Sequence, residues 1–139
     1  MKDRFQIAEE GRTLSNEEIA KTLEQALADW EAEKGAVRNA LVIPPDFTRF
    51  HSNAGFITQV FYRLLTEKGA SVDILPALGT HVPVSETQWK TMFGDIPYSK
   101  MIVHNWRTDV VKLGEVPAGE IEKIHFLEKT TGWVYFRGQ

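Results

Sequence analysis

Two short segments combine residue types that can bind an acid and move a proton. The first is Asp46-Phe47-Thr48-Arg49, where a guanidinium follows a carboxylate by three positions. Arginine clamps a carboxylate or phosphate through its planar fork, and Asp46 would orient it or bind a ligand hydroxyl. Thr48 would bond a phosphate oxygen or close the turn. A plain loop ion pair, or a turn capped by Asp46, is the structural alternative.

The second segment is Gly79-Thr80-His81. Glycine lets the backbone approach a ligand closely or adopt a positive φ. Histidine takes and returns a proton at cellular pH because its unperturbed pKa lies near neutrality. We therefore expect His81 to act as a base beside a ligand held by this loop. An exposed surface histidine without such a role is the alternative.

The other histidines have weaker support. His104 is interpreted as a strand-end residue hydrogen-bonded to Asp109 rather than as a second site residue. His51 and His125 have no supporting pattern, and we expect them on the surface.

A metal site is a third possibility, with Asp46, His81 and His104 as a triad for a divalent ion. It requires three separate loops to agree, and the spacing itself carries no metal signature. The sequence also contains neither a glycine-rich phosphate loop nor an HExxH motif.

Predicted strands carry both motifs at their ends. Strands are expected at 40–43, 72–78 and 101–103, the first of them buried on both faces because nothing polar alternates. Helices are expected between them and before them, from the capping box at Ser15 to Gly35, from Ser52 or Asn53 to Gly69, and from the capping box at Ser85 to Gly94.

This alternation predicts an α/β fold of βαβ units in three layers, with a mostly parallel sheet. Segments 109–114 and 121–126 are expected to add an antiparallel C-terminal hairpin, and the aromatic run in 130–139 needs a surface to cover. Parallel strands end at one edge, and ligands bind outside that edge in open α/β sheets. We therefore expect the two motifs to converge.

Composition limits the class of protein. The 139 residues fit a single α/β domain, 1–139, and their 42% apolar and 25% charged shares are ordinary for a globular protein. The net charge of −3 gives no basic footprint for nucleic acid. No apolar run reaches the roughly 20 residues that span a bilayer, and the first residues are too polar for a secretory signal. With no cysteine in the chain, we expect a cytoplasmic protein.

Together the motifs resemble the N-terminal part of nickel-pincer-dependent lactate racemases. That family carries Asp-x-Thr-Arg after a strand, matched by residues 46–49, and a strand running into Gly-x-His, matched by residues 79–81. A later histidine and a strand ending in Leu-Gly match His104 and Leu113-Gly114. The resemblance covers roughly residues 5 to 124, and the order and spacing of the three motifs make it fairly specific.

The resemblance implies an α/β domain that faces a second domain across the active site. It implies a nickel-pincer nucleotide, tethered to a lysine, that takes a hydride from C2 of a 2-hydroxy acid and returns it to either face. His81 matches one of two histidines that shuttle the hydroxyl proton, and Arg49 matches a residue that binds and polarises the substrate. The positions expected to line the cofactor or substrate are Asp46, Thr48, Gly79 and Thr80.

Departures from the family pattern bear on the function. Val82 replaces the usual arginine, and Phe50-His51-Ser52 replaces a more proline-rich stretch, which suggests a sugar acid or another 2-hydroxy acid as substrate. The family's second catalytic histidine, tethering lysine and nickel-binding histidine lie downstream of the matching stretch. We therefore expect the N-terminal domain of a racemase or epimerase, inactive without a C-terminal partner domain. A stand-alone nucleotide- or carboxylate-binding module and a small divalent-metal hydrolase are the alternatives.

Overall fold

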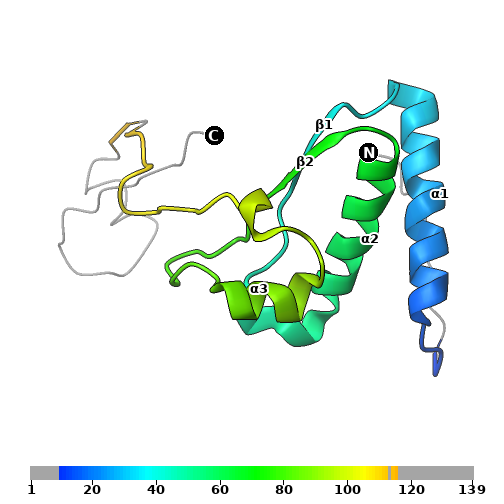
Figure 1. Cartoon of the computed structure of the whole chain (residues 1–139), viewed down its shortest axis with the longest axis horizontal. Coiled ribbons are helices and arrows are strands. Elements are labelled where there is room, and N and C mark those ends of the chain that lie inside the picture. Colours follow the sequence, from blue (N-terminus) through cyan, green and yellow to red (C-terminus); the bar gives the residue numbers. More distant parts are fainter. Residues whose placement is uncertain (1–9, 113, 116–139) are drawn as a thin grey trace, which may run out of the picture. The chain divides into compact units, whose positions relative to one another are not determined.

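The structure, a computed structural model of the chain, describes residues 10–112, 114 and 115 (Figure 1). The chain divides into two compact units, residues 1–104 and 105–139, and both predicted site motifs lie in the first. Residues 109–112 form no strand. The second arm of the predicted hairpin, His125 and the aromatic tail lie outside the described residues.

The first unit contains the three predicted helices and two of the predicted strands. In chain order these are α1 (Asn16–Lys34), β1 (Asn39–Val42), α2 (Ala54–Glu67), β2 (Ser71–Ile74) and α3 (Glu86–Phe93), with short 3-10 helices at Phe47–Ser52 and Tyr98–Lys100. Both capping boxes are present. The Ser15 and Ser85 hydroxyls accept from the backbone N–H groups of Glu18 and Gln88. Within the described part of the chain, no helix is long and apolar enough to cross a membrane.

The sheet has two parallel strands. Leu41 of β1 lies beside Asp73 of β2, and an isolated parallel bridge joins Pro45 to Ala77 beyond the strand ends. The predicted third strand is reduced to one bridge, between Ile74 and Met101. The α/β class and the parallel pairing are thus confirmed, with a smaller sheet than expected.

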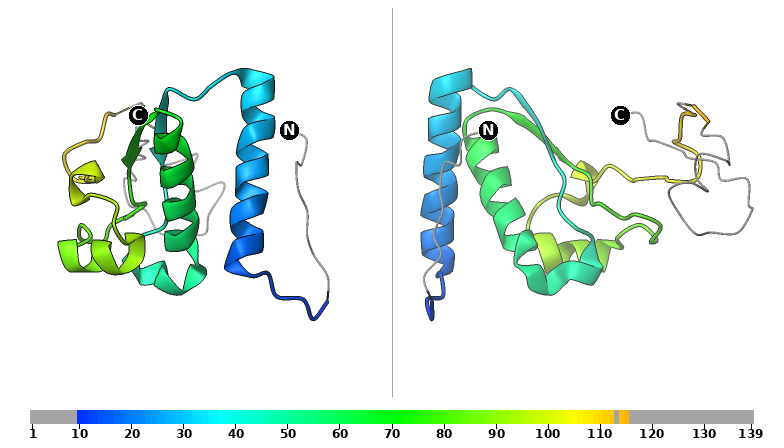
Figure 2. Two further views of the ribbon diagram at one scale, coloured as in Figure 1. Left: turned by 45° about the vertical axis from the view of Figure 1, so that its right-hand side comes forward. Right: turned by 180° about the vertical axis from the view of Figure 1, so that it is seen from behind.

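The hydrophobic core lies between this sheet and the helices. Figures 1 and 2 both show α2 between the sheet and α1, so the two long helices lie on the same side of the sheet. Leu64 of α2 and Leu27 of α1 pack with Val72 of β2. A second cluster forms where Trp89 and Phe93 of α3 meet the end of β2. Residues 85–96 therefore hold the loop after β2 against the body of the unit.

The prediction that the first strand is buried on both faces is wrong for this unit. Leu41 is 46% exposed and Ile43 is 51% exposed, because α2 covers only the alternate residues. Trp30 of α1 is also exposed.

Candidate functional site

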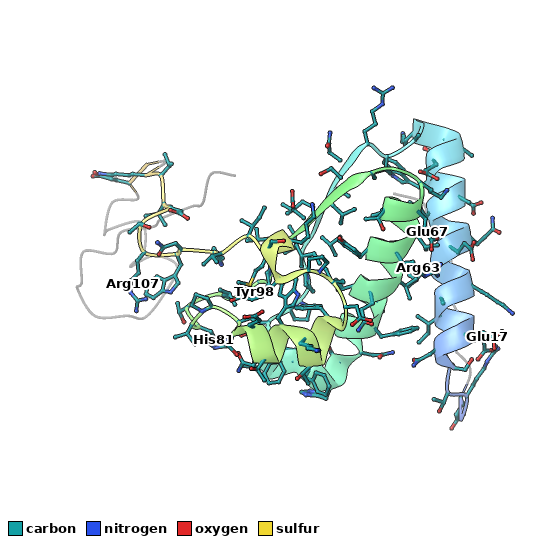
Figure 3. All side chains as sticks on the ribbon, viewed as in Figure 1. Glu17, Arg63, Glu67, His81, Tyr98 and Arg107 are labelled. Atoms are coloured by element: carbon teal, nitrogen blue, oxygen red, sulfur yellow. The ribbon has the colours of Figure 1, made fainter. Side chains whose placement is uncertain are left out.

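A carboxylate and an imidazole meet at the ends of the two strands. Oδ2 of Asp46, after β1, lies 2.5 Å from Nδ1 of His81, after β2. The Asp46 side chain is buried, at 8% exposure, whereas the His81 side chain is 55% exposed. Figure 3 shows His81 on the loop between β2 and α3, well away from Arg63 and Glu67 of α2. The pair therefore has a buried anchor and an accessible ring.

Strand pairing brings these two loops together. The backbone N–H of Ala77 donates to the carbonyl of Pro44 at 2.8 Å, which continues the parallel ladder past both strands. Leu78 is buried in the core and anchors the start of the second loop. Gly79 then turns the chain with φ at +58°, and the N–H of His81 donates to the Leu78 carbonyl at 2.9 Å. The motifs thus converge as the parallel topology predicted.

Asp46 is held as an ionised acceptor. The Thr48 hydroxyl donates to its Oδ1 at 2.6 Å, while His81 occupies Oδ2. Burial raises the pKa of Asp46, but the hydrogen bonds from Thr48 and His81 outweigh it, and the resulting pKa lies below the ordinary value. Asp46 is therefore charged at neutral pH.

This ionisation fixes the tautomer of the histidine. A carboxylate can only accept hydrogen bonds, so Nδ1 of His81 carries the proton that faces Asp46. In the neutral ring, Nε2 then presents its lone pair as the basic atom. The arrangement is therefore a base with a fixed orientation.

Arg49 lies one turn from Asp46 but does not pair with it. Its backbone N–H donates to the Asp46 carbonyl at 3.0 Å, and its own φ of −105° and ψ of 25° interrupt the 3-10 helix. Its side chain is exposed and makes no ion pair or hydrogen bond in the part of the chain that the structure describes. The alternative of a loop ion pair is therefore wrong. The guanidinium is available to bind an anion from outside the chain.

The rest of the second loop is open to solvent. Thr80 is exposed, and Val82, next to the histidine, is 81% exposed. A Cβ built on Gly79 would meet nothing within 4 Å, so its positive φ, rather than close packing, is what favours glycine there. Contact of Gly79 or Thr80 with a cofactor stays a prediction.

His104 does not join the Asp46–His81 pair. Among residues 10–112, no three histidine, aspartate or glutamate side chains come together in a way that could hold a metal ion. The predicted triad is therefore not assembled. The carboxylate of Asp109, the predicted partner of His104, accepts a hydrogen bond from the Thr108 hydroxyl at 3.2 Å within the second unit.

The direct contact between Asp46 and His81 is the feature that the sequence did not reveal. The two residues are 35 positions apart, and only the parallel register places them opposite one another. A cavity of about 500 Å³ was also not foreseen. Its wall includes Phe56, Tyr62, Arg63 and Asp95, and none of the predicted site residues lines it.

Comparisons with known proteins agree with the motifs. A family model described as the lactate racemase N-terminal domain matches residues 5–126. A crystal structure of a protein from Thermotoga maritima matches with a TM-score of 0.63 and 25% identity over 84% of this chain. This chain spans only 28% of the length of that protein. No curated protein matches.

Proposed function

The chain belongs to the family of lactate racemase N-terminal domains, and on this premise we propose that it supplies the substrate-binding and proton-transfer residues of a 2-hydroxy acid racemase or epimerase. The observation that carries the proposal is the contact between Asp46 and His81. It provides an oriented base at the carboxyl edge of the sheet, where ligands of open α/β folds bind.

In this proposal His81 acts on the substrate hydroxyl. Nε2 accepts the hydroxyl proton while Nδ1 stays hydrogen-bonded to Asp46. Loss of that proton gives an alkoxide, which releases a hydride from C2 more readily than the alcohol does. Once the hydride has returned to C2 of the resulting 2-keto acid, the proton passes back from Nε2 to the alkoxide oxygen and restores the hydroxyl. Asp46 is a positioning residue, because it acts on the substrate through the imidazole.

Arg49 is proposed to hold the substrate carboxylate. Its exposed side chain is engaged by no other group in the described residues, and a guanidinium binds a carboxylate through two parallel hydrogen bonds. Thr48, Gly79 and Thr80 are proposed to line the same space. The Thr48 hydroxyl is already bonded to Asp46, so its contribution would include fixing that carboxylate.

A hydride acceptor would have to come from outside the described residues. The nickel-pincer nucleotide of the lactate racemase system supplies that redox chemistry when it is bound. The described residues bring no three candidate metal ligands together, and the family's nickel-binding histidine and tethering lysine lie downstream of the matching stretch. We therefore assign it no step here.

We also propose that residues 1–139 act as one domain beside a C-terminal domain that completes the site. The family match, which runs across both compact units, supports the single domain. The 28% coverage of the Thermotoga maritima protein supports a larger whole. Alone, this chain would be inactive. The substrate would be a sugar acid or another 2-hydroxy acid, and the location would be the cytoplasm.

A carboxylate- or nucleotide-binding module is the second candidate. The available Arg49 guanidinium favours it, because anion binding needs no second domain. The two candidates differ at the histidine. A racemase domain recognises the 2-hydroxyl of the acid through Nε2 of His81. A simple carboxylate-binding module needs no contact between this histidine and the ligand hydroxyl.

Nitrogen NMR of the histidine rings, during titration of the purified chain, separates the candidates. We expect lactate to shift the Nε2 signal of His81, propionate to shift it much less, and Arg49→Lys to weaken both responses. Equal responses to the two acids would favour the binding module. No response to lactate or to a sugar acid such as gluconate would refute the racemase proposal.

A further inference from the structure

We propose that the sheet face opposite α2 is a docking surface for helices from the remainder of a lactate racemase-type protein. The proposal rests on the proposed function for the kind of partner, and it adds where that partner binds. The surface is defined here as the uncovered face and consists of Leu41, Ile43, Leu75 and Ile102.

The register of the sheet aligns these side chains. Val42 pairs with Ile74 and Pro45 with Ala77, so Ile43 lies beside Leu75 across the strands. On the other side of β2, the N–H of Ile102 donates to the Ile74 carbonyl at 2.8 Å. Ile102 therefore extends the same row across a third segment of chain.

Most side chains of the uncovered face are strongly exposed although they are apolar. Leu41, Ile43 and Ile102 are 46%, 51% and 44% exposed. By contrast, Val72 and Ile74, which point toward the helices, are 1% and 0% exposed. Exposed apolar residues scattered singly need no explanation, but a contiguous row marks an interaction surface.

The sequence of β1 is suited to burial on both sides. Leu41, Val42 and Ile43 are consecutive apolar residues, as in strands of parallel sheets with helices on each face. Here α2 and α1 lie on one side only (Figure 2). The absent layer is thus a helical one, and its absence explains why the predicted three-layer fold is reduced to two layers in this unit.

Two observations identify the occupant. The chain matches 28% of the Thermotoga maritima protein, so most of that protein is available to supply the covering layer. The uncovered face also lies on the strands that end at Asp46 and lead to His81. A partner docked there would be held close to the incomplete site. On the same face, Asp73 lies beside Leu41 and 3.8 Å from Lys100, so charged residues border the apolar row of Ile43, Leu75 and Ile102 on one side, as is usual at the rim of an interface.

Co-expression tests the proposal with the protein as it exists. The full chain is produced together with the part of the Thermotoga maritima protein that lies outside the matching region, and the soluble complex is isolated and its stoichiometry measured. We expect a one-to-one complex with the unmodified chain. Ile43→Asp and Ile102→Asp should reduce its recovery at least about tenfold. Trp30→Asp, at an apolar position of α1 that is 41% exposed and lies away from the sheet, should leave recovery unchanged.

Two results would overturn the proposal. One is the absence of a complex with the unmodified chain, or a complex equally tolerant of all three aspartate variants. The other is that another occupant covers the face. Sedimentation would then show a dimer of the isolated chain that Ile43→Asp dissociates, or a paramagnetic agent in solvent would fail to reach the Ile43 and Ile102 methyl groups of the isolated monomer.

The docking surface and the proposed function can fail independently. Arg49→Lys should weaken the response of the His81 Nε2 signal to lactate while leaving the complex intact. Ile43→Asp should release the complex while leaving the hydrogen bond between Asp46 and His81 intact, as read from the ring nitrogen signals. With the unmodified chain, a complex without a response to lactate would refute the proposed function alone, and a response to lactate without a complex would refute the docking surface alone.

Discussion

Nδ1 of His81 lies 2.5 Å from Oδ2 of Asp46, and this short contact joins residues that are 35 positions apart in the chain. A buried carboxylate on one ring nitrogen leaves the other nitrogen with a defined role. The orientation of the proposed base therefore depends on a residue that need not touch the substrate.

The first prediction concerns the tautomer. Asp46→Asn replaces an obligate acceptor with an amide that can also donate, so the preference for a proton on Nδ1 of His81 should weaken. Nitrogen NMR at neutral pH should show the ring nitrogens of His81 changing toward a mixture. Thr48→Val, which removes a neighbour but keeps the carboxylate, should retain the Nδ1–H form. An unchanged tautomer in Asp46→Asn would mean that the carboxylate does not orient the ring.

The second prediction concerns acid stability. The folded-state pKa of Asp46 is depressed, mainly by the Thr48 and His81 hydrogen bonds acting against burial. Its contribution to the free energy of unfolding is therefore complete above the ordinary aspartate pKa of about 3.9, and is lost as pH falls through the lower folded-state value. Thr48→Val should raise the Asp46 pKa and shift this loss to higher pH. Urea unfolding between neutral pH and about pH 3 measures it. Identical pH profiles for the two proteins would contradict the assignment.

Particular residues show how far sequence alone could go. Ser15 and Ser85 start helices because their capping boxes are local, and the two strands ending near Asp46 and His81 follow from short apolar runs. The Asp46–His81 contact required the strand register, which no local pattern encodes. The prediction that Leu41 and Ile43 are buried was wrong for a different reason. Their side chains are suited to burial on both faces, but burial depends on which layers are present, and here one face is uncovered.

The third prediction separates anion binding from stability. Arg49 is exposed and engages no other side chain in the described residues, so Arg49→Lys should change the free energy of unfolding by no more than about 0.5 kcal/mol. Lactate binding should nevertheless weaken, because lysine cannot form the two parallel hydrogen bonds of a guanidinium. Calorimetric titration measures the affinity. Arg63→Lys is the matched control, since Arg63 pairs with Glu67 at 3.2 Å on α2, away from the site. Equal losses in both variants would mean that the guanidinium of Arg49 has no specific part in lactate binding.

The fourth prediction uses two glycines with positive φ, one beside the site and one after α1. Gly79, two residues before His81, has φ at +58°, and Gly35, after α1, has φ at +91°; a Cβ at either would meet nothing within 4 Å. Alanine at Gly79 should therefore cost about 1 kcal/mol in the free energy of unfolding through backbone strain alone. Alanine at Gly35 should cost more, about 1–3 kcal/mol, because its φ of 91° and ψ of 171° lie in a region open essentially only to glycine. Relief of that strain at Gly79 would move the turn that carries His81.

Gly79→Ala should consequently weaken the hydrogen bond between Asp46 and His81 and lower the affinity for lactate, while Gly35→Ala should affect neither. Denaturant unfolding measures the cost of each substitution, and nitrogen NMR with calorimetry measures its effect at His81. Gly55→Ala gives an upper reference, because its Cβ would lie 2.2 Å from the Met92 carbonyl oxygen and should destabilise the fold well beyond the other two. If Gly79→Ala and Gly35→Ala proved indistinguishable at His81, the turn would contribute to folding without positioning the base.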